Sequence, residues 1–279
     1  MLDNVAEKLS SPKWLREAIG GRVRVLISSI GFTPTVIERE VAGENCLFYL
    51  GNVTGKCWYG TKSDVSHDMT FVKHNLVKPG DVVIECGGHH GAQTVLLSRW
   101  VGDDGKVIVV EPIPENVAIL KKNVALNELK NVIVVSKAAS DRSGRVTMRP
   151  ASNGSVAYDR RANNALEVES VSLDDLAAEL GVKPTFIKID VEGFEYRVLR
   201  GAANILAMTP AIFVEVHTLS LPRYGDAFED LWSLINPELY EISLQREDYE
   251  QPIPYTDRSS PGARAHLFFK PKCVGPSQH

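Results

Sequence analysis

Short runs of Val and Ile alternate with helical segments along most of this chain, and this alternation constrains the fold more than any other feature. From the turn Lys78-Pro79-Gly80 onward, apolar runs predict strands at 82–86, 106–111, 131–136, 185–190, 211–217, 240–244 and 265–270. The segments between them predict helices at 91–101, 115–126, 194–203 and 228–235. Continuous apolar strands separated by helices indicate a parallel sheet with both faces covered.

The predicted architecture is therefore a Rossmann-like, doubly wound α/β fold. A long loop, and no helix, joins the last two predicted strands, so we expect the final strand of the sheet to run antiparallel. A Gly/Asn/Ser-rich insertion at 140–169 separates the two halves and is expected to contain one or two short strands.

We divide the chain into an extension at 1–75, a main domain at 76–272 and a tail at 273–279. Residues 1–20 predict two short amphipathic helices broken at Pro12. Residues 21–75 predict a small antiparallel hairpin layer, with strands at 23–27, 46–50 and 56–59. If Gly51-Asn52 forms a tight hairpin turn, Cys46 and Cys57 face each other across two strands, and we favour buried free thiols over a disulfide.

Charge and composition exclude several classes of function. The formal net charge is −4 and no run of Lys or Arg is present, so we expect no nucleic-acid partner. No apolar run is long enough to cross a bilayer and the N-terminus does not resemble a secretory signal, so we expect a soluble cytoplasmic protein. A small-molecule substrate fits this profile, and a homodimer is left open.

We expect no metal site. The four cysteines show no C-x-x-C spacing, and the adjacent His89 and His90 are expected to point apart.

A glycine-rich turn follows the first predicted strand and comes directly before a helix. It reads Glu85-Cys86-Gly87-Gly88-His89-His90-Gly91. Glycines let the backbone approach a ligand, and the start of a helix offers free N–H groups. The turn lacks the dinucleotide pattern G-x-G-x-x-G, because position 89 is His and position 92 is Ala. A turn without a ligand is the plainer alternative.

A second acid, Glu111, ends the next strand and is followed by Pro112. A carboxylate at this position can accept hydrogen bonds from a ribose diol, although a solvated strand-end Glu is the simpler alternative. An acidic turn repels a pyrophosphate but suits a sulfonium and an ammonium group. The two acids, Glu85 and Glu111, therefore favour S-adenosylmethionine over NAD as cofactor.

The most informative segment runs from Phe186 to Glu195 and reads FIKIDVEGFE. Because side chains alternate along a strand, Lys188 and Asp190 share a face, as do Glu215 and His217 in the next strand. We expect Glu85, Asp190, Glu215 and His217 to gather at one rim of the sheet. Lys188 is expected to form a structural ion pair with Glu215 more than to act in catalysis, and His217 is either catalytic or an ordinary loop histidine.

These motifs together resemble the FkbM-type methyltransferases. The likeness covers about Gly80 to Lys270 and rests on 85–91, Glu111-Pro112, 139–144 and, above all, 187–195. It implies a class I methyltransferase fold with a seven-stranded sheet, S-adenosylmethionine as methyl donor, and O-methylation of sugar or polyketide hydroxyls. In the turn the sequence departs from the family pattern, with Glu85 for Asp, Gly88 for Ala and His89 for Asn.

The resemblance also assigns roles to single residues. The methionine part of the donor would be held by Glu85, Gly87, Gly88, His89 and Gly91, with Thr94 following in the helix. Glu111 and Pro112 would hold the ribose. Lys137, Ala138 and Ala139 would border the adenine, and Asp190 would lie beside the methionine end or the acceptor.

Methyl transfer to an alcohol needs alignment and a base for the hydroxyl proton. We expect His217 first and Asp190 second as that base, with Lys188 as a further catalytic candidate. Two other classes of function stay open, a non-catalytic regulatory or scaffold protein that keeps the fold and an oxidoreductase with a nucleotide cofactor.

Overall fold

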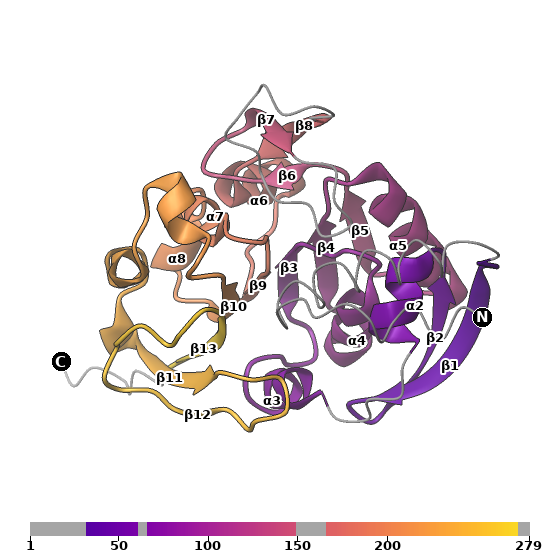
Figure 1. The fold of residues 1–279 in the computed structure, drawn as a ribbon, viewed down its shortest axis with the longest axis horizontal. Coiled ribbons are helices and arrows are strands. Elements are labelled where there is room, and N and C mark those ends of the chain that lie inside the picture. The colour runs from indigo at the N-terminus through magenta and orange to yellow at the C-terminus, as the bar shows by residue number, and fades with distance from the viewer. Residues whose placement is uncertain (1–31, 61–65, 149–165, 273–279) are drawn as a thin grey trace, which may run out of the picture.

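The computed structural model describes residues 32–60, 66–148 and 166–272. Their main sheet has the strand order β12-β11-β13-β10-β9-β3-β4-β5 (Figure 1). Its strands in chain order are β3 (Val82–Cys86), β4 (Lys106–Val110), β5 (Val132–Val135), β9 (Phe186–Ile189), β10 (Ala211–Val216), β11 (Tyr240–Gln245), β12 (Ile253–Pro254) and β13 (Ala265–Pro271).

Strand directions confirm the doubly wound fold. Strands β3, β4, β5, β9 and β10 pair in parallel, whereas β13 is antiparallel to both β10 and β11. The two-residue strand β12 adds an eighth strand, at the edge beside β11, to the seven that were predicted. A strand of two residues has no periodic pattern that a sequence could display.

Helices cover both faces of this sheet, as Figure 1 shows. They are α3 (His67–Asn75), α4 (Ala92–Val101), α5 (Pro114–Leu126), α6 (Leu173–Leu180), α7 (Glu195–Arg200), α8 (Ala203–Ala207) and α9 (Leu231–Leu234), with 3-10 turns η2 (Leu221–Tyr224), η3 (Phe228–Asp230) and η4 (Pro237–Leu239). The helix predicted at 194–203 is divided into α7 and α8, and the one predicted at 228–235 begins as η3. Within the described ranges, no helix combines the length and the apolar character that a membrane span requires.

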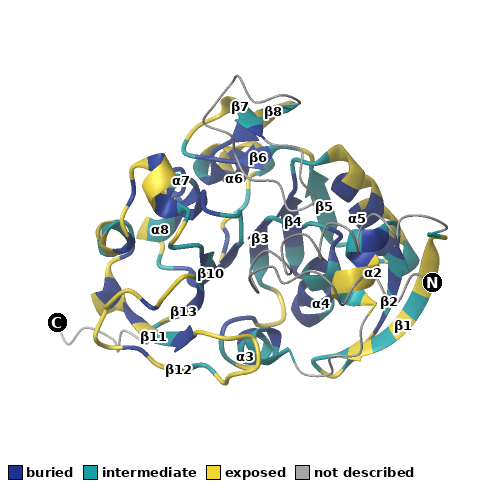
Figure 2. Cartoon of the chain, in the orientation of Figure 1, coloured by how far each residue is buried: buried dark blue, intermediate teal, exposed yellow. Residues whose placement is uncertain are grey.

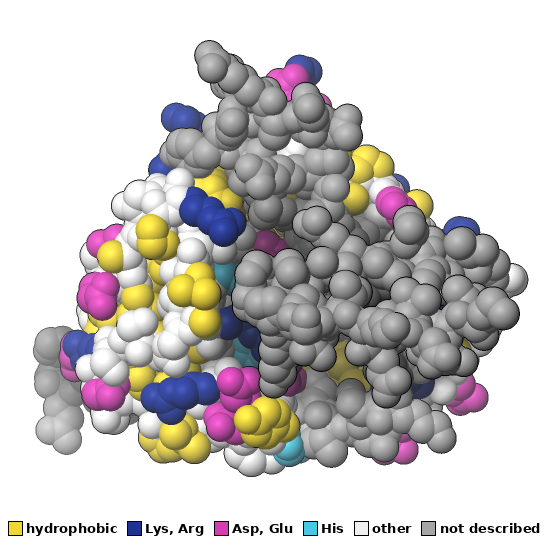
Figure 3. All heavy atoms as spheres, in the orientation of Figure 1, with side chains coloured by type: hydrophobic (Ala, Val, Ile, Leu, Met, Phe, Trp, Pro, Cys, Tyr) yellow, Lys and Arg dark blue, Asp and Glu magenta, His cyan; other side chains and the backbone are white. Residues whose placement is uncertain are grey.

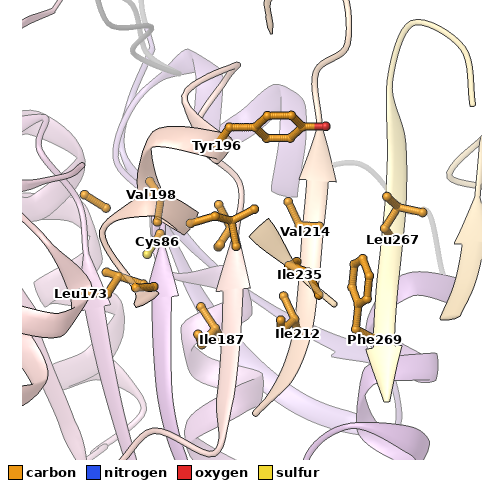
Figure 4. Close-up of a cluster of buried hydrophobic side chains, with 14 of the residues drawn as sticks. Cys86, Leu173, Ile187, Tyr196, Val198, Ile212, Val214, Ile235, Leu267 and Phe269 are labelled. Atoms are coloured by element: carbon orange, nitrogen blue, oxygen red, sulfur yellow. The ribbon is translucent and has the colours of Figure 1, made fainter. Parts of the chain in front are cut away.

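Two hydrophobic cores lie on opposite faces of the sheet, because successive strand side chains point to opposite sides. Ile187, Ile212 and Val214 pack on one face against Tyr196 and Val198 of α7 (Figure 4). Phe186 and Phe213 belong to the other core, which α3, α4 and β2 complete. Most residues of the central strands are accordingly buried, while the outer surfaces of the helices are exposed (Figure 2).

The order of strands reverses between β3 and β9. From β3 the chain builds outward through β4 and β5, and it later returns to β9 on the other side of β3. In such sheets ligands bind beyond the carboxyl ends of the strands at the point of reversal. Gly87 lies at this point with φ +82°, and a Cβ atom there would come within 1.8 Å of the Asp190 carbonyl oxygen. Only glycine permits this approach.

The insertion forms a small second sheet with the strand order β6-β8-β7. Its strands are β6 (Ala138–Ala139), β7 (Gly144–Met148) and β8 (Leu166–Val171). The prediction of short strands in this region is confirmed. Helix α6, which follows β8, was not predicted, although Ser172 caps it by accepting a hydrogen bond from the Asp175 N–H.

The extension contains a hairpin, but its turn differs from the prediction. Strands β1 (Thr35–Val41) and β2 (Glu44–Leu50) pair around Ala42 and Gly43, which both have positive φ. Asn52 begins helix α2 (Val53–Tyr59) by accepting a hydrogen bond from the Gly55 N–H. The predicted turn at Gly51-Asn52 and the predicted strand at 56–59 are therefore wrong.

The same helix separates the two cysteines that were expected to face each other. Both are free thiols, with Cys46 buried in β2 and Cys57 exposed on α2. The helices predicted at 1–20, the strand predicted at 23–27 and the tail at 273–279 lie outside the described residues.

Asn123 of α5 and Asn127, which follows the last residue of this helix, join the hairpin to the main domain. Asn123 accepts a hydrogen bond from the Tyr49 N–H at 2.6 Å and donates one to the His90 carbonyl at 2.8 Å. One turn later, Asn127 accepts from the Leu47 N–H and donates to the Leu47 carbonyl. These amides satisfy the free edge of β2, so the extension is held beside the glycine-rich turn.

We predict that Asn123→Ala lowers the free energy of unfolding by about 1–3 kcal/mol, because it leaves buried backbone groups of β2 and of the turn without partners. Urea unfolding followed by tryptophan fluorescence measures the change. Asn204→Ala, on an exposed face of α8, is the matched control and should change stability by less than about 0.5 kcal/mol. Equal losses in both variants would contradict this role for Asn123.

Candidate functional site

A pocket lies at the carboxyl edge of the sheet, where the strand order reverses. Six of the predicted cofactor residues line it, namely Gly87, Glu111, Pro112, Ala138, Ala139 and Asp190. Three strands and the small sheet contribute to these walls, so residues more than 100 positions apart in the sequence meet here. Apolar side chains that were not predicted, including Ile113, Met148 and Phe194, complete the lining.

Glu111 is buried at the end of β4, so the alternative of a solvated strand-end Glu is excluded. One carboxylate oxygen accepts a hydrogen bond from the His89 N–H at 2.8 Å. The other accepts from the Ile113 N–H and from the Asn116 amide. Burial raises the pKa of Glu111 to about 7, although these hydrogen bonds favour the charged form. The carboxylate is thus held rigidly against the pocket.

Glu85 lies beneath the turn and is not one of the residues that line the pocket. Its side chain is 1% exposed and accepts a hydrogen bond from the Thr94 hydroxyl at 2.5 Å. Burial raises the pKa of Glu85, while Lys188 and the Thr94 hydroxyl oppose the rise. Glu85 and Thr94 therefore support the turn from below in this structure.

Lys188 is a buried charge in the middle of the sheet, with its ammonium group at the base of the turn. It lies 4.0 Å from the Glu85 carboxylate, 3.4 Å from the Asp190 carboxylate and 3.3 Å from the Gly87 carbonyl. Burial alone would lower the pKa of Lys188, but Asp190 and Glu85 raise it above its ordinary value. The lysine is therefore charged and joins the ends of β3 and β9.

The predicted ion pair between Lys188 and Glu215 is replaced by other contacts. Glu215 contacts Arg264 at 3.0 Å and His266 at 3.1 Å. Strand register explains the difference, because Glu85 is the partner of Lys188 across β3 and β9, whereas Glu215 is paired with His266 across β10 and β13. Burial would raise the pKa of Glu215, but His266, His217 and Arg264 lower it to about 2.

His217 follows β10 and is surrounded by carboxylates. Its Nδ1 donates a hydrogen bond to Glu195 at 2.9 Å, and its Nε2 lies 3.5 Å from Glu192 and 3.6 Å from Glu215. Burial alone would lower the pKa of His217, but the hydrogen bond to Glu195 and the neighbouring charges raise it to about 9. The ring is protonated at neutral pH, which is the wrong state for a general base.

The expected gathering at the rim is therefore confirmed for Asp190, Glu215 and His217, whereas Glu85 is buried below them. Glu85 and Asp190 meet at Lys188, and Glu215 meets His217.

The two histidines of the turn do not point apart. The rings of His89 and His90 stack with centroids 3.8 Å apart, so that expectation is wrong. His89, with φ +47°, also accepts or donates a hydrogen bond through Nδ1 to the Tyr59 hydroxyl at 2.8 Å. Burial lowers the pKa of His90 to about 4, so this ring is neutral at physiological pH.

Helix α2 brings two aromatic residues to the turn that the sequence analysis missed. Trp58 is 51% exposed and its ring centroid lies 4.9 Å from that of His89. The Tyr59 hydroxyl lies beside His89, and burial together with the charges of Asp190, Glu85 and Glu111 raises its pKa. The signal was Asn52, which can begin a helix as well as form a turn.

The remaining predicted residues have packing or peripheral positions. A Cβ atom on Gly88 would come within 2.1 Å of Val109, and Gly91 begins α4 with φ +85°. Lys137 extends to Glu169, 3.9 Å away.

Curated relatives match parts of the chain. A hexuronic acid methyltransferase, AglP of Haloferax volcanii, is 28% identical over 49% of this chain and 56% of its own length. A Schizosaccharomyces pombe protein, provisionally described as a ribosomal RNA methyltransferase, is 27% identical over 44% of each chain. The chain thus spans about half the length of the curated relatives it matches.

Solved structures with a similar course of the chain include TYW2 of M. jannaschii in complex with AdoMet. It has a TM-score of 0.44 and 16% identity, and the match covers 86% of this chain and 89% of that one. An O-methyltransferase of Thermotoga maritima has a TM-score of 0.42 and 14% identity over 85% of this chain and 78% of that one.

The sequence model of the methyltransferase FkbM domain matches residues 85–249, which is more than half of the chain. The matched segment includes the glycine-rich turn, Glu111, the Lys188–Asp190 strand end and His217. This chain belongs to the FkbM methyltransferase family.

Proposed function

We propose that this chain transfers a methyl group from S-adenosylmethionine to a hydroxyl oxygen of a sugar or a polyketide-type small molecule. The observation that carries the proposal is Glu111, a buried carboxylate on the pocket wall at the reversal of strand order. An acid at the end of this strand can accept hydrogen bonds from the two hydroxyls of a ribose. Membership in a methyltransferase family supports the reaction class.

The residues of the pocket fit such a donor. When bound, S-adenosylmethionine supplies a methyl group on a positively charged sulfur. Apolar walls from Ile113, Ala138 and Met148 suit a purine ring, and Glu111 is the acceptor that a ribose requires. At the other end, Asp190 offers a carboxylate to the cationic part of the donor. Gly87 lines the pocket and brings no side chain between the turn and the ligand.

The sign of the charge favours this donor over a nicotinamide dinucleotide. Glu85, Glu111 and Asp190 surround the turn, and a single buried ammonium, that of Lys188, stands among them within the described part of the chain. A pyrophosphate placed here would meet like charges, which a sulfonium and an ammonium would not. This argument supports methyl transfer against the oxidoreductase alternative.

We assign the proton of the acceptor hydroxyl to Asp190. As the bond between oxygen and the methyl carbon forms, the sulfur–carbon bond breaks in line with it and the hydroxyl proton passes to the carboxylate. Lys188 is a positioning residue, because it fixes Asp190 from 3.4 Å away. The sequence ranks His217 before Asp190 as base, but the surrounding carboxylates keep that ring protonated at neutral pH.

The relatives favour a sugar as the acceptor class. The partial match to a hexuronic acid methyltransferase supports a carbohydrate hydroxyl. The match to the Schizosaccharomyces pombe protein makes RNA the alternative to exclude. On the described part of the face in Figure 3, Lys and Arg side chains are dispersed among acidic ones, which gives no continuous basic surface for a phosphate backbone.

We predict that the protein binds S-adenosylmethionine and its demethylated product in calorimetry and does not bind NAD. Glu111→Gln should weaken donor binding by about 10- to 100-fold, because the hydrogen bonds from a ribose to a charged acceptor are lost. Glu179→Gln, on the exposed face of α6, is the matched control and should bind like the parent protein.

Two results would contradict the donor site. One is an affinity for the donor that Glu111→Gln leaves unchanged. The other is a folded protein that does not bind the donor at about millimolar concentration, the upper end of the usual range of KM values.

For the acceptor, we predict methylated products with hexuronic acids or other sugars and none with total ribosomal RNA, measured by mass spectrometry of each reaction. Asp190→Asn should lower kcat by at least about 100-fold, as expected when a positioned proton acceptor is removed. Methylation confined to RNA, or methyl groups found on nitrogen, would exclude the proposed acceptor class.

A further inference from the structure

A second cluster of polar side chains lies on the rim formed by the ends of β9 and β10. It consists of Asp190, Glu192 and His217, each of which offers one ligand atom within 4.8 Å of the others. Their side chains are 29%, 28% and 16% exposed, so an ion from solvent can reach them. The donor pocket touches Asp190, and neither Glu192 nor His217 is among the residues that line it.

The imidazole of the cluster is held in one orientation. Its Nδ1 donates a hydrogen bond to Glu195, whose side chain is fully buried and also accepts from the Gly193 N–H at 2.7 Å. This leaves Nε2 directed toward the carboxylate of Glu192. A carboxylate that fixes one nitrogen of a histidine, so that the other nitrogen is free to bind, is the arrangement found behind histidine ligands of metal ions.

The second oxygen of Glu195 adds an independent observation. This atom, Oε2, is buried and has no hydrogen-bond partner among the described residues. A buried carboxylate oxygen without a partner is costly unless a positive charge lies nearby. The carboxylate touches the imidazole of the cluster, so a cation that replaces the imidazole proton at the cluster would supply that charge.

The excess of acidic groups around the rim also favours a bound cation. Among the described residues, five acids lie around two basic groups here. His217 contacts Glu192, Glu195 and Glu215. Lys188 contacts Asp190 and, below it, Glu85. The permanent cations in these contacts are Lys188 and Arg264, and Arg264 also binds Asp248. Five acids therefore share two permanent positive charges, besides the imidazoles of His217 and His266. The donor's sulfonium would offset Asp190 alone, because its pocket does not extend to Glu192.

We propose that Asp190, Glu192 and His217 bind one divalent metal ion beside the donor pocket. Two carboxylates and one imidazole suit ions that accept both oxygen and nitrogen ligands, such as Mn²⁺. The open side of the cluster faces solvent and leaves positions for oxygen atoms of a bound molecule. If the proposed function holds, an ion here binds the acceptor hydroxyl and lowers its pKa next to the donor. This last role rests on that function, whereas metal binding does not.

The test measures binding of Mn²⁺ to the full chain by calorimetry and by electron paramagnetic resonance, after dialysis against EDTA. The measurement is made over a range of about pH 7 to 9, because a histidine ligand must release its proton, and we expect Mn²⁺ to bind more tightly as the pH rises. We expect one ion per chain. Glu192→Gln and His217→Ala should each weaken binding at least about 10-fold, and Glu195→Gln about 10- to 100-fold through the orientation of the ring.

Controls separate loss of a ligand from loss of the fold. Glu238→Gln removes an exposed acid that pairs with Arg258 at a distant site, and it should bind Mn²⁺ like the parent protein. Glu192 is partly exposed, so Glu192→Gln keeps the proposal testable if the buried Glu195 variant does not fold. Circular dichroism verifies the fold of each variant.

The proposal is overturned if Mn²⁺ does not bind at about millimolar concentration, or if Glu192→Gln and His217→Ala bind it as the parent protein does. Calorimetry with S-adenosylmethionine in EDTA distinguishes the two proposals. Donor binding without Mn²⁺ binding rejects the metal site alone, whereas Mn²⁺ binding without donor binding rejects the donor site alone.

Discussion

A charged lysine in the centre of an apolar sheet is the constraint around which this site is arranged. Lys188 is 3% exposed and lies in a strand that is buried throughout. Such a charge persists only when partners satisfy it, and its partners are Glu85, Asp190 and the Gly87 carbonyl. These groups belong to the ends of β3 and β9, where the order of strands reverses. The ion pairs therefore fix the two strand ends between which a ligand would enter.

From this point the polar groups continue across the sheet on one face. Glu85 and Lys188 are paired across β3 and β9. Glu215 lies two residues beyond the position on β10 that faces Lys188, and it is paired with His266 of β13. Below these pairs the same face is apolar and packs against α3, α4 and β2. The boundary between the two zones marks the floor of the site. The extension supplies side chains above this floor. Asn123 holds β2 in place, and the helix that follows β2 places Tyr59 against His89.

The parts of the fold that rest on local pattern could be predicted. Strands such as β4 and β10 contain uninterrupted apolar runs, at 107–110 and 211–214, and a buried parallel strand requires little else. The turn at Gly87 could also be predicted, because a glycine at this position permits a close approach of the backbone. The gathering of Asp190, Glu215 and His217 followed from the alternation of side chains in neighbouring strands.

The errors arose where distant contacts choose between local alternatives. Asn52 is suited to a turn or to the start of a helix. In the structure it begins α2, and the preceding strand β2 is hydrogen-bonded to Asn127, at the end of α5. Lys188 pairs with Glu85 and Asp190 and not with Glu215, because register, which no single segment encodes, sets its neighbours. Helix α2 meets the turn only in the folded chain, so Trp58 and Tyr59 gave no sign of their position.

The central claim is that the carboxyl ends of β3, β4 and β9 form a binding site for an adenosine-containing cation. A crystal structure with the demethylated donor bound tests it most directly. The account predicts ribose hydroxyls on the Glu111 carboxylate, the purine beside Ala138 and Met148, and the sulfur toward Asp190. A ligand bound elsewhere on the molecule, or bound here without contact to Glu111, would contradict it.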